Sequence, residues 1–280
     1  MLKGLPASGK STRAKEIVAT GNYIRVNRDL LREMLHNGKW SGRNEDMTVL
    51  AEKSIAKQAL FSGLNVVVDD TNLNPKNEIM WEGIAKESQA IFETEEMKTP
   101  LETCIERDQG RDKAVGKHVI VNMALGAGLF PVPAKGFVLC DLDGTLCDIT
   151  HRLKYAKGEE KNWTKFFEGI PDDSIRVETW DMLINYRKEG YQIILVSARP
   201  EGYRTETEAW LKRHHIVYET LIMRRANDKR DDTIVKQQIY DTYFKGKYDI
   251  EAVIDDRPKV IRMWHENGLN VIDVGSGVEF

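Results

Sequence analysis

The stretch Gly4–Ser11 (GLPASGKS) decides the fold of the first half of the chain, because it fits the pattern G-x-x-x-x-G-K-[ST] of a phosphate-binding loop. Its two glycines let consecutive backbone N–H groups face the phosphates of a nucleotide and lead into the N-terminus of a helix. In such a loop Lys10 reaches the β- and γ-phosphates, and Ser11 offers its hydroxyl to Mg²⁺. The stretch therefore predicts a site for a nucleoside triphosphate.

A second stretch, Asp141–Thr145 (DLDGT), follows the apolar run Gly136–Cys140 in the middle of the chain. A carboxylate at the end of a strand can attack phosphorus, which divides one difficult displacement into two easier ones. Asp143, two residues after Asp141, can then protonate the leaving oxygen. This stretch predicts a phosphatase that forms a phospho-aspartate.

Length and composition bound the remaining possibilities. The chain has 280 residues, which at about 100–200 residues per domain suggests two domains. Its 41% hydrophobic and 30% charged residues describe a soluble globular protein, and no apolar run approaches the ~20 residues of a membrane span. We expect neither a signal peptide nor a membrane partner. A net charge of −3 argues against a broad nonspecific nucleic-acid surface but allows a local basic site.

The cysteines and histidines indicate no disulfide or zinc chemistry. Cys104, Cys140 and Cys147 are odd in number and lack CxxC spacing. The six histidines are scattered without ligand spacing. A reducing cytoplasm is therefore the expected setting.

The first half alternates strand and helix patterns. We expect strands at 22–26, 64–68 and 90–97, and helices at 45–61 and 75–88. Only Met1–Lys3 precede Gly4, so the strand before the phosphate-binding loop is expected to be very short, against the five or six residues of a typical strand. Residues 101–125 have a helical pattern that Gly110 and Gly116 interrupt, which favours a broken, lid-like segment.

Charged residues in this half leave alternatives open. Arg107 and Arg111 lie four apart, so within one continuous helix they would share a face and could both point at phosphates. A solvated helix face is the ordinary explanation for that spacing. Asp29 fits the N-cap of a helix that starts at Leu30. From the residues alone, this capping role is favoured over a catalytic role, although the two do not exclude each other.

A joint rich in glycine and proline, Gly126–Gly136, separates the two halves. We expect a first domain over 1–127, a linker over 128–135 and a second domain over 136–280. Strand patterns in the second domain lie at 137–140, 192–196, 217–222, 252–254 and 270–274, and helical patterns at 177–188, 203–213, 233–244 and 259–266. This alternation predicts a Rossmann-like α/β domain, with ligands at the carboxyl ends of its strands.

Further polar residues fall at such strand ends. Ser197 ends an apolar run and can hydrogen-bond a phosphate oxygen, with Arg199 close behind it. Asp255–Asp256 end another run and can complete an oxygen-ligand Mg²⁺ site with Asp141. Lys236 can offset charge on the phospho-aspartate. Each has an ordinary explanation as a turn or helix cap, but their joint order favours one phosphatase-type site.

These motifs, in their order, resemble two known families. The second half is similar to the haloacid dehalogenase phosphotransferases, and the first half is similar to P-loop kinases. Together, and with Asn27–Asp29 and Asp70–Asn74, the chain resembles the phage-type bifunctional polynucleotide 5′-kinase/3′-phosphatases through nearly its whole length. The resemblance implies an N-terminal P-loop kinase domain with a parallel sheet and a C-terminal haloacid dehalogenase-like α/β domain.

The resemblance also implies a role for each matching position. Asp29 would take the proton from a polynucleotide 5′-OH, and Asp143 would act as general acid and then as general base. The implied catalytic residues are Lys10, Asp29, Arg32, Arg111, Asp141, Asp143, Ser197 and Lys236. ATP would contact Gly4, Ser8, Gly9, Lys10, Ser11, Thr12, Arg107 and Arg111. The nucleic acid would contact Arg28, Arg32, Asp70, Thr145, Arg152, Ser197 and Arg199, and Mg²⁺ would contact Ser11, Asp141, Asp143, Asp255 and Asp256.

The leading hypothesis is an end-healing enzyme that uses ATP and Mg²⁺ to phosphorylate 5′-OH ends of RNA or DNA and removes 3′-phosphates before a ligase acts. A small-metabolite kinase fused to a small-molecule phosphatase is an alternative, against which the pair Asp29 and Arg32 speaks. A third hypothesis is that the first half is a regulatory module that binds ATP but does not transfer its phosphate. The resemblance further implies a homo-oligomer and, for a phage-encoded chain, the host cytoplasm.

Overall fold

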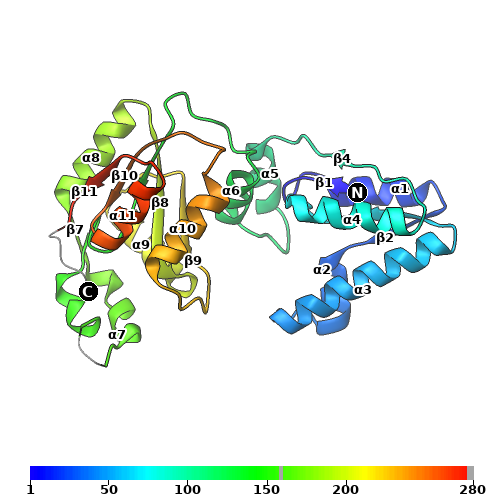
Figure 1. Cartoon of the computed structure of the whole chain (residues 1–280), viewed down its shortest axis with the longest axis horizontal. Coiled ribbons are helices and arrows are strands. Elements are labelled where there is room, and N and C mark those ends of the chain that lie inside the picture. The colour runs from blue at the N-terminus through cyan, green and yellow to red at the C-terminus, as the bar shows by residue number, and fades with distance from the viewer. Residues whose placement is uncertain (158–159, 276–280) are drawn as a thin grey trace. The chain divides into compact units, whose positions relative to one another are not determined.

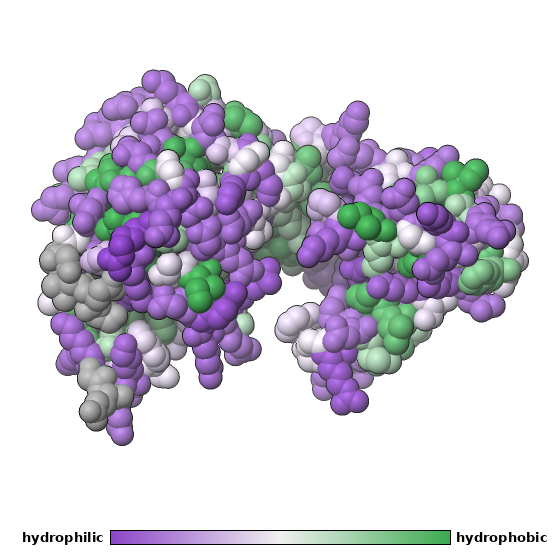
Figure 2. Space-filling view, viewed as in Figure 1, coloured by the Kyte–Doolittle hydropathy of each residue, from purple (hydrophilic) through white to green (hydrophobic). Residues whose placement is uncertain are grey.

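The computed structural model describes residues 1–157 and 160–275. It divides the chain into two units, Met1–Ala127 and Gly128–Phe280, each of which alternates strands and helices (Figure 1). The faces seen in Figure 2 are mainly hydrophilic, and the hydrophobic residues on them form small separate patches. Within the described ranges, no helix combines the length and the apolar character needed to cross a bilayer.

Short parallel strand pairs organise the first unit. β1 (Leu2–Lys3) pairs with β4 (Glu95–Glu96), and β2 (Tyr23–Val26) pairs with β3 (Asn65–Val68). The very short first strand is therefore confirmed. The strand expected at 90–97 is wrong in extent, because β1 offers only two residues with which β4 can pair.

Helices make up most of the first unit. They are α1 (Lys10–Ala19), α2 (Arg28–His36), α3 (Gly42–Phe61), α4 (Pro75–Glu87), α5 (Leu101–Gln109) and α6 (Lys117–Gly126). The helices expected at 45–61 and 75–88 are confirmed, and the break expected within 101–125 falls between α5 and α6. Trp81 of α4 packs against Val68 of β3 in the core, so the helices bury the strands that carry the site.

The start of α2 differs from the sequence prediction. Asn27, with an extended backbone, is the N-cap, and its side chain accepts a hydrogen bond from the backbone N–H of Leu30 at 2.9 Å. The prediction that Asp29 caps this helix is wrong, because the helix begins at Arg28 and places Asp29 inside the first turn. The Asp29 carboxylate is therefore not used as a cap.

The second unit is built on a parallel sheet. Among the described residues its strands are β5 (Phe137–Cys140), β8 (Gln192–Pro200), β9 (Thr220–Arg224), β10 (Ile250–Asp255) and β11 (Val271–Asp273), in the order β11-β10-β5-β8-β9. The strand expected at 217–222 starts later, because the ladder with β8 begins where Thr220 pairs with Ile194. Phe130, in the segment expected as a linker, packs its ring 5.8 Å from that of Phe137 and so lies on this unit.

Helices alternate with these strands, as Figure 1 shows. They are α8 (Val177–Lys188), α9 (Arg204–Arg213), α10 (Asp232–Tyr243) and α11 (Pro258–Glu266). β5 is central and buried along its whole length, with β10 on one side and β8 on the other. Because all of these strands are parallel, their carboxyl ends meet at one edge of the sheet.

A small insertion lies over that edge, between Leu146 and Arg176. It contains β6 (Cys147–Asp148), β7 (Ser174–Ile175) and α7 (Trp163–Glu168), with 3₁₀ turns at Thr150–Tyr155 and Ile170–Asp172. Phe166 of α7 is buried in the core of the unit. The insertion is thus anchored by packing but is far smaller than a separate domain.

Candidate active sites

Three carboxylates meet at the carboxyl edge of the second sheet. Asp141 follows β5, and Asp255 ends β10, whose Ile254 pairs with Cys140 in the parallel ladder. One carboxylate oxygen each from Asp141, Asp255 and Asp256 lies within 4.8 Å of the others, and all three residues are buried. The strand register therefore brings together side chains that are more than a hundred residues apart in the sequence.

Lys236, from α10, lies between two of these carboxylates. Its Nζ is 3.0 Å from Asp141 Oδ1 and donates to Asp255 Oδ2 at 2.8 Å. Burial disfavours the charged amine, but the two carboxylates outweigh burial and raise the pKa of Lys236 above its ordinary value. Burial raises the pKa of Asp141 well above its ordinary value, and the Lys236 charge opposes that rise. The lysine offsets only part of the negative charge at this edge.

The carboxylate group fits a hard divalent cation such as Mg²⁺. Its donors are all oxygen, which such cations prefer. Burial raises the pKa of Asp256 to about 6, the Thr145 hydroxyl at 2.7 Å opposes the rise, and the neighbouring Asp255 carboxylate adds to it. Gly144 has a φ of +86°, and a Cβ there would lie 2.2 Å from Asp256 Oδ2, so a glycine is required.

Asp143 has a different environment from the other acids of the DLDGT stretch. Arg199 Nε lies 3.0 Å from both of its carboxylate oxygens, and Arg152 Nη2 donates to Oδ1 at 2.5 Å. Burial favours the neutral acid, but the two arginines outweigh it and hold the pKa of Asp143 well below its ordinary range. The structure therefore places this side chain with the arginines, although the sequence also predicted it as a metal ligand.

Asp173, which the sequence analysis missed, holds the same two arginines from the other side. Its Oδ2 accepts hydrogen bonds from Arg152 Nη2 at 2.6 Å and from Arg199 Nη2 at 3.0 Å. Asp173 and Arg199 are fully buried, and the Asp173 backbone carbonyl accepts the Trp210 indole N–H at 2.7 Å. In the sequence Asp173 is one of two adjacent aspartates, and its neighbour Asp172 is exposed in a turn. No periodic pattern therefore indicates that Asp173 is the buried one.

Ser197 lies in β8, beside β5. Its hydroxyl accepts the backbone N–H of Arg199 at 3.2 Å, which is the turn-cap contact that the sequence analysis gave as the ordinary explanation. The residue is also buried at the carboxyl edge of the sheet, so a phosphate reaching Asp141 would compete for this hydroxyl.

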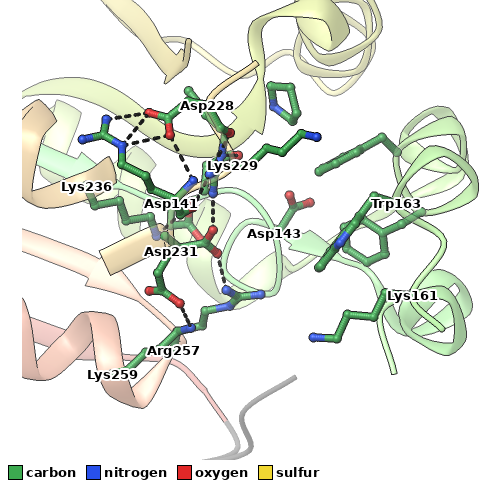
Figure 3. A pocket seen from close by; sticks show the side chains of 17 residues that line it. Asp141, Asp143, Lys161, Trp163, Asp228, Lys229, Asp231, Lys236, Arg257 and Lys259 are labelled. Carbon is green, nitrogen blue, oxygen red and sulfur yellow. Dashed lines mark hydrogen bonds and ion pairs between the residues drawn. The ribbon is translucent and has the colours of Figure 1, made fainter. Parts of the chain in front are cut away.

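A cleft of about 550 Å³ opens over this edge and is lined by Asp141, Asp143 and Lys236 (Figure 3). The volume lies within the range of sites that bind small molecules. Seven basic and five acidic side chains line it, so basic groups are available to a phosphate beside the carboxylates. Arg152 and Arg199 were predicted to bind the phosphate. In the structure both guanidinium groups are ion-paired with Asp143, which lines the cleft.

The phosphate-binding loop of the first unit closes on itself. Lys10 Nζ donates to the backbone carbonyls of Gly4 at 2.9 Å and Leu5 at 2.6 Å, and burial lowers the pKa of Lys10 to about 8. Gly9 caps α1 with a φ of +100°, which favours glycine. Ser11 and Thr12, on the first turn of α1, are exposed. Ser8 is buried.

A second cluster joins α2, α3 and the segment after β3. Arg28 Nε donates to Glu52 Oε2 at 2.7 Å and lies 3.5 Å from Asp70 Oδ2, while the Arg28 backbone N–H donates to Asp70 Oδ1 at 3.0 Å. Glu52 is fully buried, and burial, together with the hydrogen-bonded Asp70, raises its pKa to about 8. Glu52 was not predicted from the sequence, although it interrupts the buried register of α3 between Thr48 and Ala56.

Asp29 and Arg32, predicted as base and phosphate ligand, are paired with each other. Arg32 Nη1 donates to Asp29 Oδ1 at 2.6 Å, and Arg32 Nε donates to Glu45 Oε2 at 3.0 Å. The Asp29 side chain is 87% exposed. The base that was predicted is therefore accessible to a polymer end.

The predicted lid is a loop between two helices. α5 ends at Gln109, so Arg107 and Arg111 do not share the face of one helix, and both are exposed. The buried Asp108, which the sequence analysis missed, accepts Arg111 Nη1 at 3.3 Å and the backbone N–H of Gly116 at 2.8 Å. Asp108 thereby sets the shape of the loop that carries Arg111.

Comparisons with known proteins give both halves a family. Residues 135–279 match the model of the polynucleotide kinase PNKP phosphatase domain, and residues 1–125 match an AAA domain model. These matches confirm the predicted fold class, an N-terminal P-loop domain followed by a haloacid dehalogenase-like α/β domain.

Individual relatives cover the chain to different extents. A protein of Autographa californica nuclear polyhedrosis virus, named as a bifunctional polynucleotide kinase/RNA ligase, is 30% identical over 295 residues, covering 95% of this chain and 40% of that protein. The L-seryl-tRNA(Sec) kinase of Methanococcus maripaludis is 30% identical over 162 residues, or 55% of this chain and 60% of the kinase. A chain of the Pnkp1/Rnl/Hen1 RNA repair complex is 28% identical with a TM-score of 0.46, covering 99% of this chain and 96% of that one. This chain thus spans about half the length of the curated relatives that it matches.

Proposed function

This chain belongs to the polynucleotide kinase PNKP phosphatase-domain family, and from that premise we propose that it is a bifunctional end-healing enzyme. It transfers the γ-phosphate of ATP to 5′-OH ends of nucleic acids and hydrolyses 3′-phosphates. The observation that carries the proposal is the buried group of Asp141, Asp255 and Asp256 beside Lys236, in the same chain as a complete phosphate-binding loop. The domain boundary near 127, with the linker at 128–135, stays part of this proposal.

The phosphatase reaction begins at Asp141. A carboxylate oxygen of Asp141 attacks the phosphorus of a 3′-phosphate, the P–O3′ bond breaks, and Asp143 gives its proton to the leaving oxygen. A water molecule then attacks the phosphorus and gives a proton to Asp143. The bond from Asp141 to phosphorus breaks, which releases inorganic phosphate and restores the Asp141 carboxylate.

Substrate binding prepares Asp143 for its role as an acid. Arg152 and Arg199 keep Asp143 ionised in this structure. When both guanidinium groups bond phosphate oxygens, their pull on Asp143 weakens and its pKa rises. Asp173 keeps the two arginines oriented throughout. The proton donor is thus formed only when a phosphate is present.

Charge at the carboxylate edge is balanced by Lys236 and a cation. Asp141, Asp255 and Asp256 would hold Mg²⁺, which supplies positive charge that offsets the phosphate oxygens. Lys236 compensates negative charge on Asp141 as the aspartyl phosphate forms. Thr145 and Ser197 are the hydroxyls available for hydrogen bonds to the phosphate.

In the kinase reaction Asp29 takes the proton of the 5′-OH while that oxygen attacks the γ-phosphate of ATP, and ADP leaves. Lys10 turns from the carbonyls of Gly4 and Leu5 to the β- and γ-phosphates, and Ser11 provides a hydroxyl for Mg²⁺. The remaining ATP contacts proposed are Gly4, Ser8, Gly9, Thr12, Arg107 and Arg111.

The acceptor side of the kinase is formed by α2 and its neighbours. Arg32 leaves Asp29 to bond the phosphate next to the 5′-OH. Arg28 and Asp70, with Glu52 behind them, order the acceptor pocket. We place the protein in a reducing, ATP-containing compartment such as the cytoplasm, because the kinase reaction consumes ATP and the three cysteines are free.

The products, 5′-phosphate and 3′-OH ends, are the substrates of a nucleic-acid ligase, so we place this enzyme before a ligase. The name of the baculovirus relative, which joins a polynucleotide kinase to an RNA ligase, supports this order. A homo-oligomeric state is also proposed, and sedimentation would measure it.

The decisive experiment uses γ-labelled ATP and an oligonucleotide with a 5′-OH and a 3′-phosphate. We expect label on the 5′ end and release of unlabelled phosphate from the 3′ end in the same tube. Lys10→Ala should remove only the label, because it takes away the cation for the ATP phosphates. Nucleotide binding without transfer to any acceptor would contradict the kinase assignment, and transfer to small alcohols alone would favour a metabolite kinase.

A further inference from the structure

One wall of the phosphatase cleft takes no part in the reaction described above. It is formed by Trp163 and Phe167 of α7, both of which line the cleft beside Asp143. The two rings stack with an interplanar angle of 25° and centroids 6.1 Å apart. Tyr203 packs against Phe167, with ring centroids 4.9 Å apart. We call these three residues the aromatic wall.

The aromatic wall is built differently from the core beneath it. Phe166, the next aromatic on α7, is 3% exposed and meets the Trp163 ring edge-on at 5.6 Å. Trp163 is 44% exposed. Its indole is therefore fixed by rings on the protein side while much of its surface remains accessible, an arrangement that packing alone does not require.

The position of the wall relates it to the reacting groups. Figure 3 shows Trp163 and Lys161 on one side of the cleft, with Asp143 between them and Asp141. Lys161 Nζ lies over the Trp163 ring, 5.4 Å from the ring centroid, in a cation–π contact that an incoming base would replace. A phosphate held at Asp141 therefore faces an aromatic surface and a cation across the cleft.

The opposite wall carries charge instead of rings. Lys259 pairs with Asp231 at 2.7 Å, and Arg230 pairs with Asp228 at 2.6 Å, at the mouth of the same cleft. Such a wall suits the charged backbone of a polymer, whereas the aromatic wall suits the flat face of a base. The two walls thus separate the two chemical parts of a nucleotide.

We propose that the aromatic wall stacks the base of the 3′-terminal nucleotide while its phosphate lies at Asp141. The inference rests on the proposed 3′-phosphatase activity and names how that site selects its substrate. Every base has a π-face, so the wall accepts all four bases with little preference. Stacking of this kind corresponds to about 5- to 150-fold in affinity per base.

The test crosses a protein variant with a substrate variant. Trp163→Ala and Trp163→Phe are compared with wild type on a 3′-phosphorylated single strand and on the same strand with an abasic 3′-terminal residue. For Trp163→Ala we expect KM on the normal strand to rise about 5- to 150-fold with kcat nearly unchanged. On the abasic strand the wild type should already have a high KM, because no base is present to stack. Trp163→Ala should then raise KM no further.

Controls separate the ways in which this proposal can fail. Trp163→Phe keeps an aromatic ring and should recover most of the affinity. Trp40 is an exposed tryptophan of the other unit, and Trp40→Ala should leave KM unchanged for both substrates. Circular dichroism checks that each variant is folded. Equal KM effects of Trp163→Ala on both strands, or no effect on either, would overturn the stacking proposal while 3′-phosphatase activity stands. A wild type that hydrolyses small phosphate esters but no 3′-phosphorylated strand would overturn the proposed function, and the stacking proposal with it.

Discussion

In the second unit the proposed reactive carboxylates Asp141, which is buried, and Asp143, which is 17% exposed, are held by fixed cations, whereas in the first unit the proposed base Asp29 is 87% exposed and paired with Arg32. The phosphatase groups stand on the ends of buried parallel strands, which fix them before any substrate arrives. The kinase groups stand on the start of a helix, on a loop and on a lid segment.

The difference concerns what each site must do on binding. Lys10 bonds carbonyls of its own loop, and Arg111 bonds Asp108, so the kinase residues satisfy one another in this structure. In the proposed kinase reaction, ATP and the acceptor break these pairs, and their binding energy drives that change. In the second unit a phosphate needs only to replace Asp143 as the partner of Arg152 and Arg199. One site is assembled by folding, and the other is completed by its substrates.

The largest expected effect separates the two sites completely. Asp141→Asn keeps the size of the side chain but removes the anionic nucleophile and one charge of the proposed metal site. Release of 3′-phosphate should fall to background, while 5′-labelling from γ-labelled ATP persists. Loss of both activities in a folded variant would show that the two sites are not independent.

The next prediction concerns the exposed base of the first unit. Asp29→Asn removes a proton acceptor, so 5′-phosphorylation should fall about 10²–10⁴-fold, with 3′-dephosphorylation intact. Turnover at saturating ATP and acceptor is the measurement, and circular dichroism is the folding check. A turnover within threefold of wild type would contradict the role of Asp29 as a base. Asp29 would then only stabilise the first turn of α2 through its negative charge.

A third prediction addresses how strongly folding fixes the phosphatase arginines. Asp173→Asn removes one charge from the buried group of Arg152 and Arg199, which should cost about 3–5 kcal/mol of stability. Asp172→Asn, at the exposed neighbouring position, is the matched control and should be nearly neutral. Chemical denaturation measures both variants, and the lost orientation should also shift the pH profile of phosphate release. Equal stability of the two variants would deny Asp173 its positioning role.

The smallest effect is a pH dependence in the first unit. Glu52 has its pKa raised to about 8 by burial and by Asp70, so the folded state binds a proton that the unfolded state releases at lower pH. Stability from this group is full at acidic pH and is lost as pH rises through about 8. Glu52→Gln, which is uncharged at every pH, should melt like wild type near pH 4 and above it at pH 9.

Exposed Glu33→Gln serves as the control for that comparison, and its melting curve should follow wild type at every pH. Parallel melting curves for wild type and Glu52→Gln across this range would mean that Glu52 is ionised in the folded protein. In that case Arg28 would be paired with two full negative charges.

Much of the fold follows from local sequence. The phosphate-binding loop, the strand before Asp141 and most helices were predicted because glycine positions, apolar runs and helical periodicity act over a few residues. The errors in the extent of strands occurred where a partner strand decides the outcome. β4 is limited by the two residues of β1, and β9 takes its start from its pairing with β8.

The sequence by itself determined the chemistry of this protein, since GLPASGKS and DLDGT each require their own residues at fixed short spacing. It also placed Ser197, Lys236 and Asp255 at strand or helix positions near one another. Only the tertiary structure decided which acids face which cations. Asp143 joined Arg199 instead of the carboxylate group, and Asp173 and Asp108 emerged as buried partners that no local pattern marks. Glu52 interrupts the buried register of α3, but its partners Arg28 and Asp70 were known only from the structure. The reason is physical: a local pattern fixes the backbone conformation and the buried face of an element, but an ion pair is fixed by strand register and burial between segments far apart in the chain.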